Sequence, residues 1–141
     1  YTYSGHPVCA AVALENLRLL DEDGIIDHAR DVAGPYLAQK WAELGNHPLV
    51  GEARIIGMMA ALELTPNKAT RAPFKAEAGT VGLRCRERCF ANRVIMRHVR
   101  DTMIISPPLI MTKDDIDMLF DRAVKSLDET LAGLKSDGLM A

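Results

Sequence analysis

The residues best suited to chemistry lie in the first turn of the chain, Thr2 to Pro7, directly before an apolar helical segment. Pro7 suits the first position of a helix, because its missing N–H group would have no intrahelical partner there. A hydroxyl-rich turn with Gly5 at a helix start presents free backbone N–H groups and the positive end of a helix dipole, which favours an anion such as phosphate. An ordinary capping turn has the same composition, so spacing alone leaves both interpretations open.

Two cysteines, Cys85 and Cys89, have a spacing that also occurs in zinc sites. A zinc site needs a second pair of ligands, which Cys9 and His6 do not supply. We therefore expect buried or half-buried thiols and no metal. His6 also lies close to Ser4, but two positions apart on a turn is not the geometry that a general base requires.

The most basic stretch of the chain runs from Arg84 to Arg100. A nucleic-acid site would need these arginines on one surface, with aromatic rings to stack on the bases. Helix and strand geometry scatters them instead, and Phe90 is the only aromatic residue among them. The formal net charge of −2 likewise gives no general attraction to nucleic acid or to an anionic membrane.

Several blocks of the sequence resemble one known family. They are T-Y-S-G-H-P-V-C-A-A-V-A-L-E-N-L after Tyr1, H-P-L-V-G-E-A-R-I-I-G-M-M-A-A-L-E-L (47–64), G-L-R-C-R-E-R-C-F-A-N (82–92) and R-D-T-M-I-I-S-P-P-L-I-M-T (100–112). In this order they resemble the C-terminal third of the class III, pyridoxal-phosphate-dependent aminotransferases. The resemblance is strongest to the ω-amino-acid and amine:pyruvate branch.

The resemblance implies a cofactor site to which this chain contributes its first residues. In the family, a threonine of this segment contacts the phosphate of the pyridoxal 5′-phosphate held by the neighbouring subunit, and the matching residue is Thr2, with Tyr1 beside it. The lysine that forms the Schiff base belongs to a motif that would lie before Tyr1. We therefore expect an intact homodimer or dimer of dimers that is active, and an isolated chain that is inactive.

The resemblance also implies a carboxylate site. In the amine:pyruvate branch a mobile arginine precedes the S-P-P motif by a few residues, and the matching position is Arg97. A guanidinium pairs with a carboxylate through two hydrogen bonds, and its long stem can swing aside for an apolar group. A solvent-exposed strand arginine is the alternative, and Arg93 and Arg100 do not match the family position.

The expected reaction transfers an amino group from an amine or ω-amino acid to a keto acid such as pyruvate. Decarboxylation, racemisation or amino-group migration within the same family is one alternative, and a non-catalytic assembly domain is another. Because the chain opens inside a turn that leads into an apolar helix, we expect a large domain upstream. Which amine is the donor depends on residues outside this chain.

Composition fits one globular domain with its own core, since 48% of the 141 residues are hydrophobic and 26% are charged. No apolar run approaches the roughly 18–20 residues that span a bilayer. Three cysteines without framework spacing fit a reducing cytoplasm, where we expect the protein to be located.

Periodicity and caps predict the elements that must position these residues. Three helices are expected at Pro7–Asp21, at Ile25–Leu44 with a kink or a local break at Gly34-Pro35, and at about Thr80–Phe90 with Asn92 as its C′ residue. A fourth should begin after Thr112, which forms a capping box with Asp115, and end near Ser136. Strands are expected within 49–64, bent or bulged near Gly57, and at Val94–Val99 and Thr102–Ile105, joined by a hairpin at Arg100-Asp101.

This order predicts an α+β fold, a small antiparallel sheet with helices on one face. It matches the C-terminal small domain of a fold-type I pyridoxal-phosphate enzyme. We assign residues 1–24 to the end of the large domain and the interdomain helix, and residues 25–141 to the small domain. The first helix is apolar over so wide an arc that we expect it to lie between two domains or subunits.

Overall fold

The computed structural model describes residues 4–140. Tyr1 and Thr2, predicted to form part of the cofactor site, lie outside the described residues. In chain order the elements are α1 (Pro7–Glu22), α2 (Ile25–His28), the π-helical segment η1 (Ala29–Ala33), α3 (Gly34–Leu44), β1 (Val50–Ile56), β2 (Met59–Leu64), α4 (Thr80–Ala91), β3 (Arg97–Val99), β4 (Thr102–Ile105) and α5 (Lys113–Ser136). None of the helices within residues 4–140 is long and apolar enough to cross a membrane.

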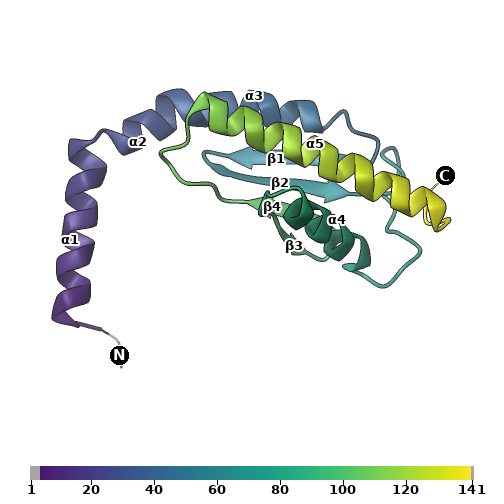
Figure 1. Ribbon diagram of the computed structural model, residues 1–141, viewed down its shortest axis with the longest axis horizontal. Coiled ribbons are helices and arrows are strands. Elements are labelled where there is room, and N and C mark those ends of the chain that lie inside the picture. The colour runs from purple at the N-terminus through teal and green to yellow at the C-terminus, as the bar shows by residue number, and fades with distance from the viewer. Residues whose placement is uncertain (1–3, 141) are drawn as a thin grey trace.

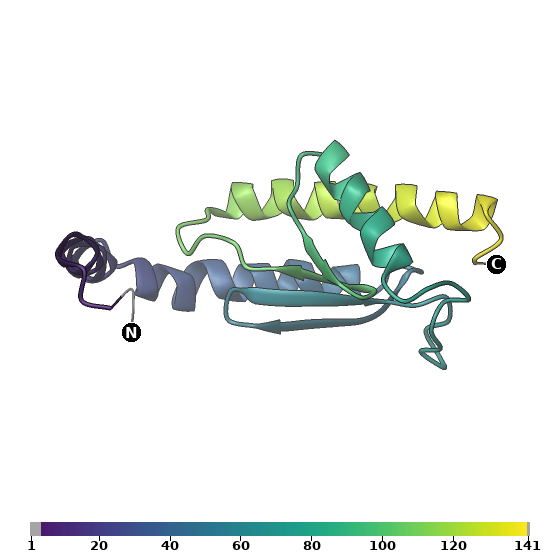
Figure 2. The same ribbon diagram turned by 90° about the horizontal axis from the view of Figure 1, so that it is seen from below.

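The four strands form one antiparallel sheet in the order β1-β2-β4-β3, which confirms the predicted α+β fold (Figure 1). Burial alternates along β2 and β4 and so distinguishes the two faces of the sheet. Met59 is exposed, whereas the buried side chains are those of Ala60, Leu62, Met103 and Ile105. Helices α4 and α5 lie on the same side of the sheet in Figure 2, and α3 packs against β1 and α5. The opposite side of the sheet, here called the open face, has no helix over it in this view.

Helix α1 stands apart from this assembly (Figure 1). None of its residues is buried, and Leu14 is 69% exposed. An apolar helix that buries nothing against the rest of its described chain needs another surface to cover it. This agrees with the wide apolar arc of the sequence, and the surface that would cover α1 lies outside the described residues.

The kink or local break expected at Gly34-Pro35 takes the form of a π-helical segment directly before Gly34, where α3 begins. The helical path continues through both residues, and the irregularity is the π-helical segment Ala29–Ala33 that precedes them, closed by a bond from the Gly34 N–H to the Ala29 carbonyl. Pro35 has no N–H for the carbonyl four residues before it, and a π segment accommodates that lost bond without breaking the helix. A Cβ at Gly34 would lie 2.6 Å from the Ala29 oxygen, so only glycine fits this close to the Ala29 carbonyl without a shift of the backbone.

The chain bends near Gly57, as one of the two expected alternatives has it, but the bulge of the β1–β2 hairpin lies elsewhere. Gly57, with φ of +55°, lies in the turn between the two strands, while the register shifts between Val50 and Glu52, at Gly51. A Cβ at Gly51 would lie 2.6 Å from Cγ2 of Thr65, so the bulge occurs where that side chain crowds the backbone.

Two boundaries near β3 also differ from prediction. The positive φ that follows α4 belongs to Arg93 rather than to Asn92, whose side chain instead donates to Ser126 and Glu129 on α5. Strand β3 begins at Arg97 rather than Val94. The hairpin at Arg100-Asp101 and the capping box at the start of α5 are confirmed.

Candidate functional site

Arg97 lies on the open face of the sheet. Its register partner on β4 is Ile104. Ile104 lies opposite Ala61 of β2, and Ala61 lies opposite Arg54 of β1, so these four residues form one row across the sheet. Residues directly opposite each other on neighbouring strands share a face. Since Met103 on one side of Ile104 points into the core, the row from Arg54 to Arg97 faces outward. Arg97 itself is exposed.

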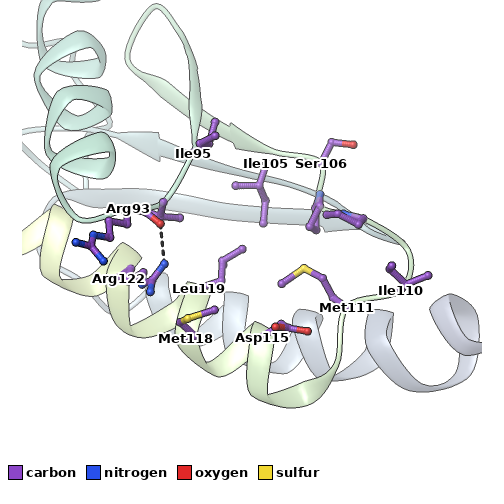
Figure 3. Close-up of a pocket in the computed structure, with 13 residues that line it drawn as sticks. Arg93, Ile95, Ile105, Ser106, Ile110, Met111, Asp115, Met118, Leu119 and Arg122 are labelled. Carbon is purple, nitrogen blue, oxygen red and sulfur yellow. Dashed lines mark hydrogen bonds between the residues drawn. The ribbon is translucent and has the colours of Figure 1, made fainter.

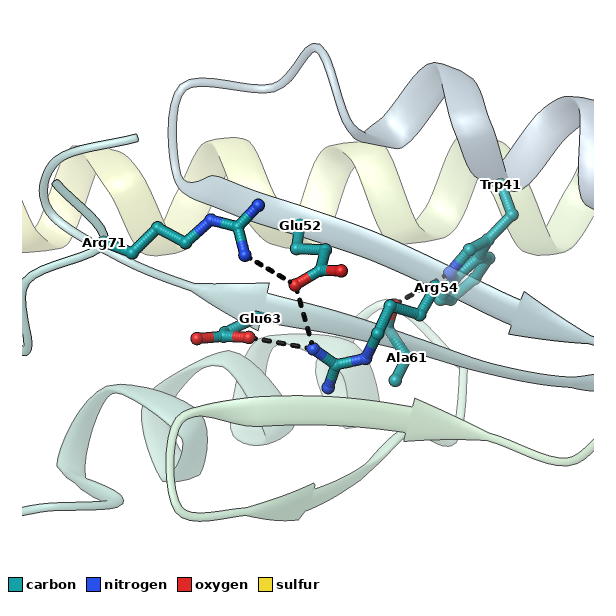
Figure 4. Close-up of polar contacts among 6 residues, drawn as sticks. All are labelled: Trp41, Glu52, Arg54, Ala61, Glu63 and Arg71. Carbon is teal, nitrogen blue, oxygen red and sulfur yellow. Dashed lines mark hydrogen bonds and ion pairs between the residues drawn. The ribbon is translucent and has the colours of Figure 1, made fainter. Parts of the chain in front are cut away.

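The two arginines at the ends of this row differ in their partners. Arg54 donates to Glu63 at 2.9 Å and to Glu52 at 3.2 Å, and Arg71 from the connector donates to the same Glu52 at 2.9 Å (Figure 4). The bond to Glu63 raises the pKa of the Arg54 guanidinium. Arg97 takes part in none of the ion pairs found within residues 4–140. Its guanidinium is therefore available to an external carboxylate, whereas that of Arg54 is committed.

The network around Arg54 was not predicted from the sequence. Glu52 and Arg54 alternate along one strand, which indicates a shared face, but the partner Glu63 is identified only by the register of β1 against β2. Arg71 reaches the network from the connector between β2 and α4, at a φ of +50°. No local pattern marks such a long-range contact.

The other two arginines considered for the carboxylate site have backbone roles elsewhere. The carbonyl of Arg93 accepts a hydrogen bond from Nη1 of Arg122 at 2.7 Å. Arg100 occupies the β3–β4 turn with φ of +51°, and its carbonyl lies against Gly82 of α4. Neither belongs to the row that Arg97 ends.

A hollow of about 580 Å³ lies between the first half of α5 and the segments on either side of the β3–β4 hairpin (Figure 3). Its walls are mainly apolar, with Ile95, Ile110 and Met118 among them. Of its charged members, Asp115 caps α5 and Arg122 binds the Arg93 carbonyl. Arg97 is not among the residues that line it, so the hollow and the candidate carboxylate site are separate.

The lysines of the chain are placed unlike a Schiff-base lysine. Lys40 lies 2.8 Å from the carboxylate of Asp117, and this bond raises the pKa of Lys40, whereas a nucleophilic lysine needs a lowered pKa. Lys68 donates to the carbonyls of Gly45 and His47. The others are exposed: Lys75, Lys113, Lys125 and Lys135.

Cys85 and Cys89 are both buried, as predicted, while Cys9 is exposed. The hydrogen bond between the two buried thiols, together with burial, raises the pKa of Cys85, which makes it a poor nucleophile. No cluster of His, Cys, Asp and Glu able to hold a metal occurs in the part of the chain that the structure describes.

The start of α1 carries no group of its own that would neutralise the positive end of the helix. Pro7 is in the first turn, Gly5 has φ of +78°, and the first turn holds neither an acidic residue nor a side-chain cap. The positive end of this helix is therefore not neutralised by its own residues.

Comparison with known proteins agrees with this architecture. A sequence profile described as "Aminotransferase class-III" matches residues 1–127. A putrescine–pyruvate aminotransferase of Pseudomonas aeruginosa is 56% identical over 134 residues, which cover 95% of this chain and 29% of that protein. The mitochondrial gamma-aminobutyrate transaminase 1 of Oryza sativa subsp. indica is 37% identical over 139 residues, covering 96% of this chain and 27% of the relative.

Solved structures show the same fold. The ω-transaminase of Pseudomonas jessenii in complex with PMP superposes with a TM-score of 0.88 at 36% identity, covering 96% of this chain and 29% of that one. The chain thus spans less than a third of the length of the relatives it matches. Sequence and fold together show that the chain belongs to the class III aminotransferases, of which it represents a C-terminal portion.

Proposed function

We propose that this chain is part of a pyridoxal-phosphate-dependent aminotransferase that transfers an amino group from an amine or ω-amino acid to a keto acid such as pyruvate. Membership of the family supports the reaction class. The similarity to a putrescine–pyruvate aminotransferase favours a diamine donor and pyruvate as acceptor. The observation that carries the acceptor assignment is Arg97, an exposed guanidinium on the open face without an ion-pair partner among the described residues.

The assembly that we propose follows from the same features. Residues 1–24 end the large domain and cross to residues 25–141, which form the small domain, and the exposed apolar side chains of α1 are covered by the large domain and by a second subunit. The intact enzyme is a cytoplasmic homodimer or dimer of dimers. Thr2, with Tyr1 beside it, contacts the phosphate of the cofactor held by the partner subunit.

Arg97 has one task in this function, which is to bind the carboxylate of the keto acid and orient its carbonyl carbon. Two parallel N–H···O bonds fix the plane of the carboxylate, which a single ammonium could not do. The cofactor, when bound, supplies the electron-accepting ring that carries the amino group between the two substrates. For an amine without a carboxylate, the guanidinium turns toward solvent on its flexible stem.

The test is Arg97→Ala in the intact enzyme. Loss of hydrogen bonds to a charged group should cut kcat/KM for pyruvate or alanine by about ten- to a hundredfold. The half-reaction of an amine donor without a carboxylate should change far less. Arg54→Ala is a matched control, because it removes an arginine from the other end of the same row. Equal losses on both substrates in Arg97→Ala would show that Arg97 supports the fold instead.

A further inference from the structure

Helix α4 begins without a cap of its own. Its N-cap residue is Gly79, which has φ of +95° and no side chain, and the first turn contains no acidic residue. The carboxylate of Asp101, from the turn between β3 and β4, caps the helix instead. Its Oδ1 accepts from the Gly82 N–H at 2.9 Å and its Oδ2 accepts from the Gly79 N–H at 3.3 Å. The helix is therefore capped, and its positive end neutralised, by a residue distant in sequence.

The backbone at this contact is closely packed. A Cβ at Gly82 would overlap the carbonyl oxygen of Arg100 and lie 3.2 Å from Cα of Asp101. The carbonyl of Asp101 accepts in turn from the Leu64 N–H at the end of β2, at 3.0 Å. Asp101 thus joins the β3–β4 turn to α4 through its side chain and to β2 through its backbone.

Strand β3, which carries Arg97, contacts α4 and is hydrogen-bonded to one strand only. It lies at the edge of the sheet, and its register joins Arg97, His98 and Val99 to β4 alone. A strand this short has few ladder bonds, so its position depends on its two ends: the buried Met96 before it and the turn that follows it. That turn is held on α4 by the Asp101 carboxylate.

We propose that Asp101 is a positioning residue for Arg97. By fixing the β3–β4 turn against the start of α4, it holds β3 in the register and orientation that place the Arg97 guanidinium on the open face. This inference rests on the proposed function, in which Arg97 binds the carboxylate of the keto acid. Asp101 itself touches neither substrate nor cofactor.

The experiment compares Asp101→Ala and Asp101→Asn in the intact enzyme. Asp101→Ala should raise KM for pyruvate and lower kcat/KM by about tenfold, while the half-reaction of the carboxylate-free amine changes less than about twofold. Asp101→Asn keeps an oxygen that can accept from Gly82 and should recover most of the loss. Thr112→Ala is the control, because it removes a helix cap from α5 and should cause no loss specific to pyruvate.

A double-mutant cycle separates positioning from general support. If Asp101 acts through Arg97, adding Asp101→Ala to Arg97→Ala should lower kcat/KM for pyruvate little further. Equal losses on both substrates in Asp101→Ala, or full additivity with Arg97→Ala, would overturn the inference and leave the proposed function intact. An Arg97→Ala variant without substrate selectivity would overturn both.

Discussion

The same substitution, Gly→Ala, should change the free energy of unfolding in opposite directions at two helical glycines. Gly82 lies in the first turn of α4 and Gly133 in α5, and Gly→Ala within a helix by itself stabilises by up to about 0.5–1 kcal/mol. A Cβ at Gly133 meets no atom within 4 Å, so the full gain should appear there. At Gly82 the added carbon overlaps the Arg100 carbonyl, which is backbone and cannot rotate away.

The expected cost at Gly82 has two parts. Overpacking against a fixed backbone costs about 1–3 kcal/mol. Displacing the turn also weakens the hydrogen bond from the Gly82 N–H to the Asp101 carboxylate, a charged acceptor whose bonds are worth about 1.5–3 kcal/mol when fully lost. After the helix-propensity gain is subtracted, Gly82→Ala should lower the free energy of unfolding by about 2 kcal/mol.

Urea unfolding of the 141-residue chain at low concentration measures this difference. Trp41 is the only tryptophan and is 1% exposed, so its fluorescence reports loss of the core. With a urea slope of about 1–3 kcal/mol/M, the midpoints of the two variants should differ by about 1 M or more, with Gly133→Ala above wild type. Coincident midpoints would refute the close approach of the hairpin to α4.

Three further outcomes are expected. In the intact enzyme, Thr2→Val should weaken cofactor retention by about ten- to a hundredfold in dialysis, and unchanged retention would rule out the phosphate contact. The isolated chain should associate through the exposed apolar side chains of α1. The substitutions Val12→Lys and Leu17→Lys should shift its mass, measured by light scattering, toward that of the monomer. A monomeric wild type at high concentration would contradict this. Thr112→Ala should lower Tm by about 3 °C at neutral pH. Hydrogen bonds from the Thr112 hydroxyl and N–H hold the pKa of Asp115 below its ordinary value. The capping box therefore stabilises the fold above a pH of about 4 and weakens below it. The difference in Tm between wild type and Thr112→Ala should shrink at pH 2–3.

Local patterns were sufficient for most of the elements. The capping box of Thr112 and Asp115 involves residues three apart, and the hairpin at Arg100-Asp101 needs only a polar turn between two short apolar strands. Such signals depend on neighbours within one or two turns of chain, so they survive without knowledge of the fold. At Gly34 the local sequence indicated an irregularity but not its π-helical form, and the bulge at Gly51 depends on the strand register and on Thr65, which no local pattern reveals.

The candidate site divides in the same way. The sequence alone identified the family resemblance, the α+β class and Arg97 as the arginine to test. Only the tertiary structure decided that β2 pairs with β4, which places Arg97 and Arg54 at opposite ends of one row across the sheet. It also decided that Asp101 caps α4. The physical reason is that strand register and long-range caps depend on which surfaces meet after folding, and residues separated by many turns of chain carry no local record of that choice.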